Sequence, residues 1–196
     1  MRLYIKDSKG DNRSRFLIFD ELSNLQYKVS VEKTALTIKL DIFDNHSNNR
    51  VAKIRKRDIL FLKTYTISCK DKKIKVIGKF SESDVNFYIN GINWFFMGDI
   101  LKKDFEVINV DKSVIMSHKQ RVAEAEVYYE INVNDENNKL LCICIALCIE
   151  ILNVDTELGS KNLLKNKAIF KKEALPQKCF KINKNIKMKS RRKKWM

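Results

Sequence analysis

The sequence predicts a mostly β domain in which a sheet of many antiparallel strands curls around one apolar helix. Before residue 134, apolar and polar residues alternate with a period of two, which is typical of half-buried strands. Polar turn segments separate these runs at short intervals, as in an antiparallel meander. Residues 140–152 then read Leu-Leu-Cys-Ile-Cys-Ile-Ala-Leu-Cys-Ile-Glu-Ile-Leu, with almost no polar atom on any side.

The strand pattern is clearest at residues 34–44, where four apolar side chains share one face and polar side chains take the other. Similar segments occur at residues 2–6, 15–19, 25–31, 51–56, 63–69, 74–80, 84–90, 92–97, 104–109, 114–119 and 124–133. Together they indicate about twelve strands. The turns between them are rich in Asp, Asn and Ser, and Asn90-Gly91 is the strongest hairpin signal in the chain.

The apolar run at residues 140–152 predicts a buried helix. Thirteen helical residues rise only about 20 Å, well short of the ~30 Å hydrocarbon core of a membrane, and Glu150 lies inside the run. Residues 134–138, Asn-Asp-Glu-Asn-Asn, supply a capping residue and acidic groups for a helix N-terminus. We therefore expect a helix at about residues 136–152, enclosed by protein because no side of it is polar.

Several of these segments resemble a known family. They are Gly91-Ile-Asn-Trp-Phe-Phe-Met-Gly-Asp99, Asp104-Phe-Glu-Val-Ile108, the strand end Tyr129-Glu-Ile131, and the acidic cap with its apolar helix. In this pattern and in its Met-Arg-Leu-Tyr-Ile start, the chain resembles the LURP-one-related family of the Tubby C-terminal-like superfamily over roughly residues 1–154. The resemblance implies a twelve-stranded barrel closed around a central C-terminal helix, and so a barrel domain at residues 1–155.

Positive charge is concentrated in a basic tail at residues 156–196. The chain has a net charge of +15. Fourteen Lys and Arg against two Glu give the tail 14 − 2 = +12, and the other 155 residues carry 25 − 22 = +3. We expect the tail to be partly helical or disordered. Its end suits an anionic membrane surface, and the alternative is a disordered solubilising tail. The candidate tether residues are Arg191, Arg192, Lys193, Lys194 and Trp195.

Two further basic clusters lie within the barrel domain. One predicted strand carries Lys53, Arg55, Lys56 and Arg57. A predicted turn is surrounded by Lys70, Lys72 and Lys73. Arg binds phosphate oxygens through bidentate hydrogen bonds and Lys binds them as a point charge. A charge run is more often only a solvated face. Some Tubby-like relatives bind phosphoinositide headgroups, so the resemblance adds support to binding, although it does not indicate which residues bind. The candidate anion or headgroup ligands are Lys53, Arg55, Arg57, Lys72 and Lys73.

No pattern in the sequence indicates catalysis, a metal or a cofactor. The five cysteines are odd in number and form no Cys-x-x-Cys pair, and Cys142, Cys144 and Cys148 fit small buried hydrophobes. His46 and His118 have no nucleophile or second ligand near them in sequence and are expected to be solvated surface groups. The sequence also lacks a Gly-rich phosphate loop and the common hydrolase motifs. We therefore expect a protein that is not an enzyme and has no cofactor.

Residues 94–97, Trp-Phe-Phe-Met, are apolar on both faces of a predicted strand. Trp94 and Phe96 are expected to pack in the core. Phe95 and Met97 then either pack under a loop or form an exposed patch for a partner.

These observations favour a non-enzymatic barrel that binds an anionic ligand, or the phospholipid headgroups of a membrane surface, with the tail as an electrostatic tether. The alternatives are nucleic-acid binding through the tail and a purely structural or partner-binding domain. Lys6, Asp7 and Lys9 interrupt the start of the chain before a secretory signal can form. We therefore expect a cytoplasmic protein without a transmembrane span, attached peripherally to the membrane, and leave its oligomeric state open.

Overall fold

The computed structural model describes residues 1–8, 15–34, 37–59, 62–80, 85–123 and 126–152. All of them belong to the first of the two units into which the chain divides, Met1–Thr156. The predicted basic tail lies outside the described residues.

Each of the twelve predicted strand segments overlaps a strand of the structure. The strands are β1 (Arg2–Asp7), β2 (Phe16–Asp20), β3 (Leu25–Lys33), β4 (Thr37–Asp44), β5 (Arg50–Ile59), β6 (Leu62–Cys69), β7 (Lys72–Phe80), β8 (Val85–Asn90), β9 (Trp94–Asp99), β10 (Asp104–Asn109), β11 (Val114–Ala123) and β12 (Glu126–Val133). The prediction of a mostly β, twelve-stranded fold is therefore confirmed.

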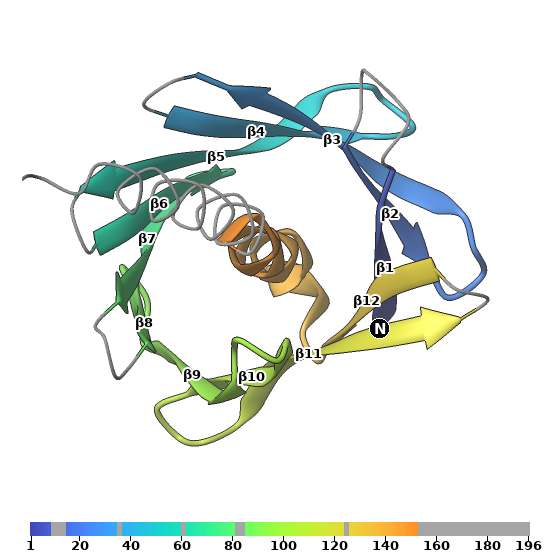
Figure 1. Ribbon diagram of the computed structural model, residues 1–196. Coiled ribbons are helices and arrows are strands. Elements are labelled where there is room, and N and C mark those ends of the chain that lie inside the picture. Colours follow the sequence, from blue (N-terminus) through green and yellow to red (C-terminus); the bar gives the residue numbers. More distant parts are fainter. Residues whose placement is uncertain (9–14, 35–36, 60–61, 81–84, 124–125, 153–196) are drawn as a thin grey trace, which may run out of the picture. The chain divides into compact units, whose positions relative to one another are not determined.

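The strands form one antiparallel sheet that curls into a nearly closed barrel (Figure 1). Its order is β8-β7-β6-β5-β4-β3-β2-β1-β12-β11-β10-β9. The first and last strands of the chain pair with each other, with Arg2 opposite Asn132. Among the described residues no ladder of backbone hydrogen bonds joins β8 to β9. The prediction of a fully closed barrel is wrong at this seam.

The hairpin predicted at Asn90-Gly91 is wrong for the same reason, since β8 and β9 do not pair. A two-residue type I′ turn needs positive φ at both residues, and of these two only Gly91 has it, at +106°. A Cβ on Gly91 would lie 3.3 Å from the Lys73 carbonyl oxygen and 3.3 Å from Ile74 Cγ2. The glycine therefore serves a close approach of the chain to β7.

Aromatic rings meet across the seam where backbone hydrogen bonds do not. The ring of Phe87 on β8 lies 5.9 Å from that of Phe96 on β9, edge to face. Phe96 in turn lies 5.6 Å from Phe105 on β10. Edge-to-face pairs at such distances are attractive beyond their apolar burial, so side chains hold the two edges of the sheet together inside the barrel.

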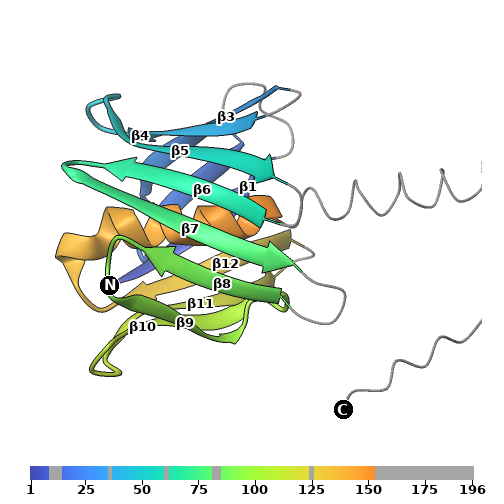
Figure 2. The same cartoon turned by 90° about the vertical axis from the view of Figure 1, so that its left-hand side faces the viewer.

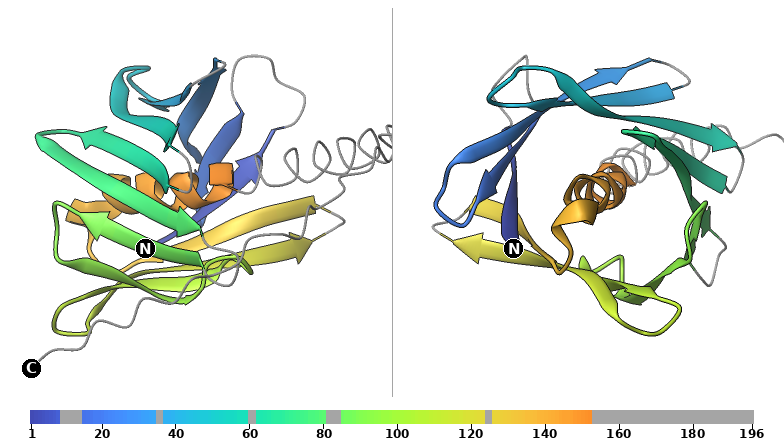
Figure 3. Two further views of the ribbon diagram at one scale, coloured as in Figure 1. Left: turned by 60° about the vertical axis from the view of Figure 1, so that its left-hand side comes forward. Right: turned by 180° about the vertical axis from the view of Figure 1, so that it is seen from behind.

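The helix begins where the sequence predicts. A 3₁₀ turn at Glu136–Asn138 opens it, and the side chain of the cap residue Asp135 accepts a hydrogen bond of 3.0 Å from the backbone N–H of Asn137. Residues 139–152 are then helical. In Figures 1 and 3 this helix runs inside the ring of strands, and Figure 2 shows it from the side.

Every residue from 140 to 152 is buried, in one hydrophobic core with the inward faces of the strands. Cys142, Cys144 and Cys148 are part of this core and are fully buried, so the prediction of small buried hydrophobes is confirmed. Burial disfavours a thiolate. It raises the pKa of Cys142 to about 12 and the pKa values of Cys144 and Cys148 well above the ordinary thiol range.

We predict that Ile145→Asp prevents folding. Ile145 is fully buried, and an unpaired charge there costs several kcal/mol, about the whole stability of a domain at roughly 5–15 kcal/mol. Urea denaturation followed by circular dichroism should show no cooperative transition. The control Leu22→Asp changes a side chain that is 81% exposed and should unfold like the parent. A soluble Ile145→Asp protein with a cooperative transition would contradict the enclosed position of the helix.

Candidate functional site

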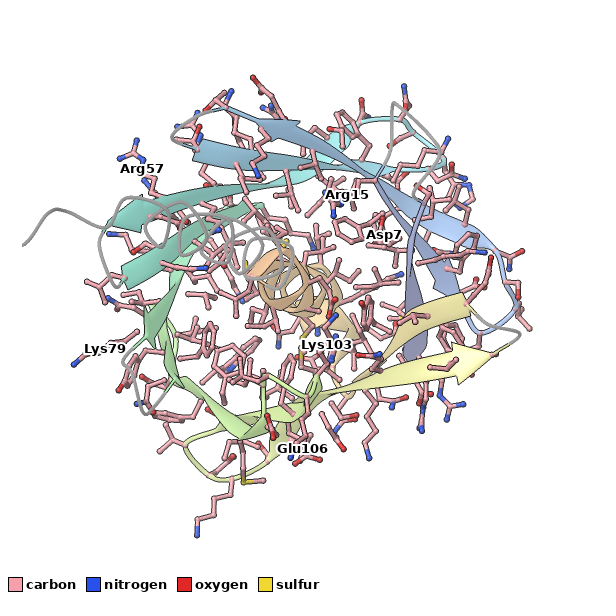
Figure 4. The ribbon with its side chains drawn as sticks, in the orientation of Figure 1. Asp7, Arg15, Arg57, Lys79, Lys103 and Glu106 are labelled. Atoms are coloured by element: carbon pink, nitrogen blue, oxygen red, sulfur yellow. The ribbon has the colours of Figure 1, made fainter. Side chains whose placement is uncertain are left out.

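A group of cations covers the outside of strands β4 to β7. Side chains alternate between the two faces of a strand, and the even-numbered positions in the middle of β5 and β7, among them Ile54 and Ile74, are buried. The odd-numbered basic residues therefore point outward, as Figure 4 shows for Arg57 and Lys79. We call this group the basic outer face. It consists of Lys39, Lys53, Arg55, Arg57, Lys73, Lys75 and Lys79.

The sheet register places these cations in rows across the strands. Arg55 lies opposite Lys39 on one side and Thr66 on the other, and Thr66 lies opposite Lys75. The next row runs from Lys53 through Ser68 to Lys73. Neighbouring strands lie about 4.8 Å apart, so cations two strands apart are separated by roughly 10 Å.

Few of these charges are neutralised. Lys39 bonds to Glu32 at 2.8 Å, and Asp41, in the row of Lys53, bonds to Arg50 at 3.3 Å. Within the described part of the chain, no carboxylate lies within ion-pair distance of the other members of the face. These are Lys53, Arg55, Arg57, Lys73, Lys75 and Lys79. The face is thus a source of positive potential.

The structure brings together four of the five residues predicted to bind an anion, namely Lys53, Arg55, Arg57 and Lys73. Lys72 is apart from them, because it belongs to the opposite face of β7 and its Nζ donates to Asn138 Oδ1 at 3.5 Å. The tether residues Arg191, Arg192, Lys193, Lys194 and Trp195 lie outside the described residues. Lys56, counted with the strand cluster in the sequence, is buried on the inner side, 3.2 Å from Asp58.

Sequence reasoning missed Lys39, Lys75 and Lys79. The signal for two of them was present, because Lys73, Lys75 and Lys79 alternate with apolar residues along β7. The lysines of β7 lie near the cations of β5 because of the register of β6, the strand between β5 and β7. The sequence does not display that register.

A surface depression among the described residues does not favour anions. It has a volume of about 530 Å³ over the outside of β1, β2 and β12. Its charged lining residues are Lys6, Glu21 and Glu126, and Lys6 and Glu126 form an ion pair of 2.5 Å. The remaining charge, that of Glu21, is negative.

A second cluster of polar groups lies inside the barrel, at the C-terminal end of the helix. Lys103 Nζ donates to Glu150 Oε2 at 2.9 Å and to the Tyr129 hydroxyl at 2.6 Å. It also lies 4.3 Å from the centre of the Tyr129 ring. His118 completes the cluster, with Nδ1 3.1 Å from the Lys103 carbonyl oxygen and Nε2 3.2 Å from Glu150 Oε1.

Lys103 reaches this cluster from a turn and not from a strand. Lys103 lies in the turn between β9 and β10 with φ +59°, a left-handed conformation that is unusual for a side chain other than Gly, Asn or Asp. Burial lowers the pKa of Lys103, but the charge of Glu150 and the hydrogen bonds to Tyr129 and Glu150 outweigh it and raise that pKa above its ordinary value. Burial, and then the charge of Glu150, raise the pKa of Tyr129. Lys103 thus stays a cation and Tyr129 a neutral phenol.

The prediction that His118 is a solvated surface group is wrong, whereas His46 is exposed as predicted. His118 is fully buried, with its ring stacked 4.6 Å from that of Phe105 and 5.7 Å from that of Tyr129. Its side chain is on the same face of β11 as the buried Met116. That alternation was the available signal, and the polar residues after His118 obscured it.

This buried cluster holds the helix to the sheet. Its lysine is protonated, so it offers no free amine as a base or nucleophile, and its carboxylate is only 3% exposed. The described residues contain no group of three His, Cys, Asp or Glu side chains that could hold a metal ion. They also contain no helix that is long and apolar enough to cross a membrane.

Comparisons with known proteins identify the family of the chain. The chain belongs to the LURP-one-related family, whose model matches residues 1–150. It is 24% identical to the uncharacterized protein YxjI of Bacillus subtilis (strain 168) over 158 residues, which are 80% of this chain and 96% of the relative. An X-ray structure of a protein from Arabidopsis thaliana aligns with a TM-score of 0.49 and 13% identity, over 78% of this chain and 91% of the other.

We predict that Lys103→Met destabilises the protein by about 3–5 kcal/mol, because it leaves the Glu150 carboxylate buried without its cation. The double variant Lys103→Met/Glu150→Leu should be more stable than Lys103→Met alone, since no charge is then left unpaired. Denaturant titration of the two single variants and the double variant measures this coupling.

Lys102→Met is the matched control. Lys102 is the neighbouring residue and also forms an ion pair, with Asp99 at 3.1 Å, but its side chain is 83% exposed. Exposed pairs contribute at most about 1 kcal/mol. Equal losses of stability for Lys102→Met and Lys103→Met would refute the role given to the buried pair.

Proposed function

We propose that this protein is a non-enzymatic barrel that binds an anionic ligand or the phospholipid headgroups of a membrane surface through its basic outer face. The observation that supports this proposal is the set of six cations on β5 and β7 without a carboxylate partner among the described residues. Folding alone does not require such a face, because like charges at this spacing repel one another. An anion would relieve that repulsion.

The position of the helix supports a site on the outside. We infer that the strands enclose a central helix, whose residues 140–152 are all buried in one core with the inward strand residues. Side chains then fill the interior, and a ligand has to bind on the outer surface. Of the two outer surfaces described above, only the basic outer face carries a net positive charge.

The residue types suit phosphate. Arg55 and Arg57 are exposed and can each present two N–H groups to a pair of phosphate oxygens. Lys53 and Lys73 lie in the neighbouring row as point charges. Near an anionic membrane each cation contributes about 1 kcal/mol, so a few together hold the protein reversibly.

The proposal includes the basic tail as a second electrostatic contact. Residues 156–196 carry a net charge of 14 − 2 = +12, and their end combines Arg191, Arg192, Lys193 and Lys194 with Trp195. Attachment of both parts to the same anionic membrane would make the protein a peripheral membrane protein of the cytoplasm. Nucleic-acid binding through the tail, and a role that is only structural, are the alternatives that the following experiments separate.

We predict that Arg55→Gln/Arg57→Gln weakens binding to anionic vesicles by about 2 kcal/mol, or roughly thirtyfold, because two cations are lost. Co-sedimentation with phosphatidylcholine vesicles, with and without phosphatidylserine, measures the partition coefficient. The control Lys119→Gln/Arg121→Gln makes the same change of charge on β11, where the two residues already pair with Asp104 and Glu130. If both double variants lose the same affinity, only net charge matters and the proposed site is wrong.

Removal of residues 156–196 tests the tail. We expect the shortened protein to remain folded and to lose most of its binding to anionic vesicles at low salt, because twelve of fifteen net charges are removed. Raising the salt from 0.1 M to 1 M should weaken binding of the full chain, since the Debye length falls from about 10 Å to about 3 Å. Equal binding of the full chain to single-stranded DNA would reduce the tail to a nonspecific polycation, and undiminished binding after truncation would leave the barrel as the sole site.

A further inference from the structure

We infer that an apolar strip beside the basic outer face inserts into the interfacial region of an anionic lipid bilayer. The strip consists of Ile77 on β7, Tyr88 on β8, Phe95 and Met97 on β9, and Ile108 on β10. The inference rests on the proposed function and goes further, because it selects a lipid surface over a free anion and fixes which side of the barrel meets it.

The register places these residues side by side. Ile77 lies opposite Tyr88, and Phe95 lies opposite Ile108. Across the seam, the inward rings of Phe87 and Phe96 are in contact. Because Tyr88 and Phe95 are their chain neighbours, these two outward side chains flank the same point of the seam.

The strip is at least partly exposed although four of its five residues are strongly apolar. Tyr88, Phe95 and Met97 are 55%, 53% and 52% exposed, and Ile77 and Ile108 are half-buried. The inner faces of the same strands already fill the core with Phe87, Trp94 and Phe96. Packing within the barrel therefore does not account for apolar residues on the outer face of β9, and large exposed apolar patches mark interaction sites.

Charge complementarity identifies the occupant. Lys75 and Lys79 lie on either side of Ile77 on the outer face of β7, and the register row of Ile77 continues through Thr64 to Arg57. Aromatic and other apolar side chains next to Lys and Arg are the composition that binds the interface of an anionic bilayer. A tyrosine at the edge of such a strip suits the headgroup level, where its ring is buried and its hydroxyl stays wet.

An acidic residue at the border of the strip determines how the barrel is oriented on the membrane. Glu106 on β10 lies opposite Met97, and Figure 4 shows Lys79 and Glu106 on different parts of the barrel wall. A carboxylate held against phosphatidylserine is repelled. The membrane therefore contacts the β7–β9 side of the strip, and Glu106 limits how far the contact extends towards β10.

The experiment uses the full chain and vesicles of phosphatidylcholine with phosphatidylserine. Phe95→Ser/Met97→Ser should lower the partition coefficient about tenfold, a loss that corresponds to part of the transfer free energy of two apolar side chains, and the loss should persist in high salt. Glu106→Gln should raise it. Leu22→Ser, at an apolar residue that is 81% exposed in the turn after β2, should leave it unchanged. Thermal unfolding checks that all variants are folded.

The depth to which the strip inserts into the bilayer is measured separately with Phe95→Trp. This variant has one tryptophan more than the parent protein. Lipids brominated on their acyl chains should quench the fluorescence of that added tryptophan. Absence of additional quenching, or unchanged binding of Phe95→Ser/Met97→Ser, would overturn the inference while the effect of Arg55→Gln/Arg57→Gln still supports the basic outer face. If instead Arg55→Gln/Arg57→Gln binds anionic vesicles as well as the parent protein, the proposed function itself is wrong.

Two further outcomes would assign the strip to another occupant. If the parent protein is a dimer in light scattering and Phe95→Ser/Met97→Ser is a monomer, the strip binds a second copy of the chain. If the same substitutions weaken binding to single-stranded DNA as much as to vesicles, the aromatic side chains stack on bases. Either result overturns insertion into a bilayer.

Discussion

A helix that is apolar on every side is the constraint on which the rest of the structure depends. Residues 140–152 contain one ionisable carboxylate and no polar face, so a helix packed against one face of a flat sheet would leave apolar surface in water. A twisted sheet that curls around it removes all of that surface from water. The inward positions of twelve strands supply the cover, and the outward positions are left to polar residues and to function.

Glu150 is the one charged residue in the buried segment 140–152, and its carboxylate needs polar partners. A carboxylate in the core needs a cation and hydrogen bonds. Its cation is Lys103, which comes from the turn after β9. His118 and Tyr129 on the next strands then line the same cluster. The one charged residue of the buried helix segment thus lies with a lysine from a turn and two polar side chains of the barrel wall.

The sequence predicts the features that depend on local pattern. Alternation locates every strand, and the cap at Asp135 locates the start of the helix. The errors concern contacts between distant segments. Asn90-Gly91 has the composition of a tight hairpin, but Gly91 packs closely against β7. His118 is next to polar residues in the chain, although its ring lies between those of Phe105 and Tyr129. Lys75 and Lys79 join Arg55 and Arg57 only through the register of β6, which no local pattern encodes.

The break in the barrel falls between two consecutive strands, β8 and β9, while β1 and β12, the first and last strands of the described residues, are joined. The N-terminal amine of Met1 donates to the Val133 carbonyl oxygen at 3.0 Å, and the Val133 N–H returns a bond of 2.8 Å to Met1. In folding terms, the domain is two uninterrupted meanders, β1–β8 and β9–β12, each built from pairings close in sequence. Only the β1–β12 ladder has to close a loop of more than a hundred residues, and such loops form slowly because their entropy is lost before their contacts are gained. We therefore expect the meeting of β1 and β12 to limit the rate at which the barrel forms.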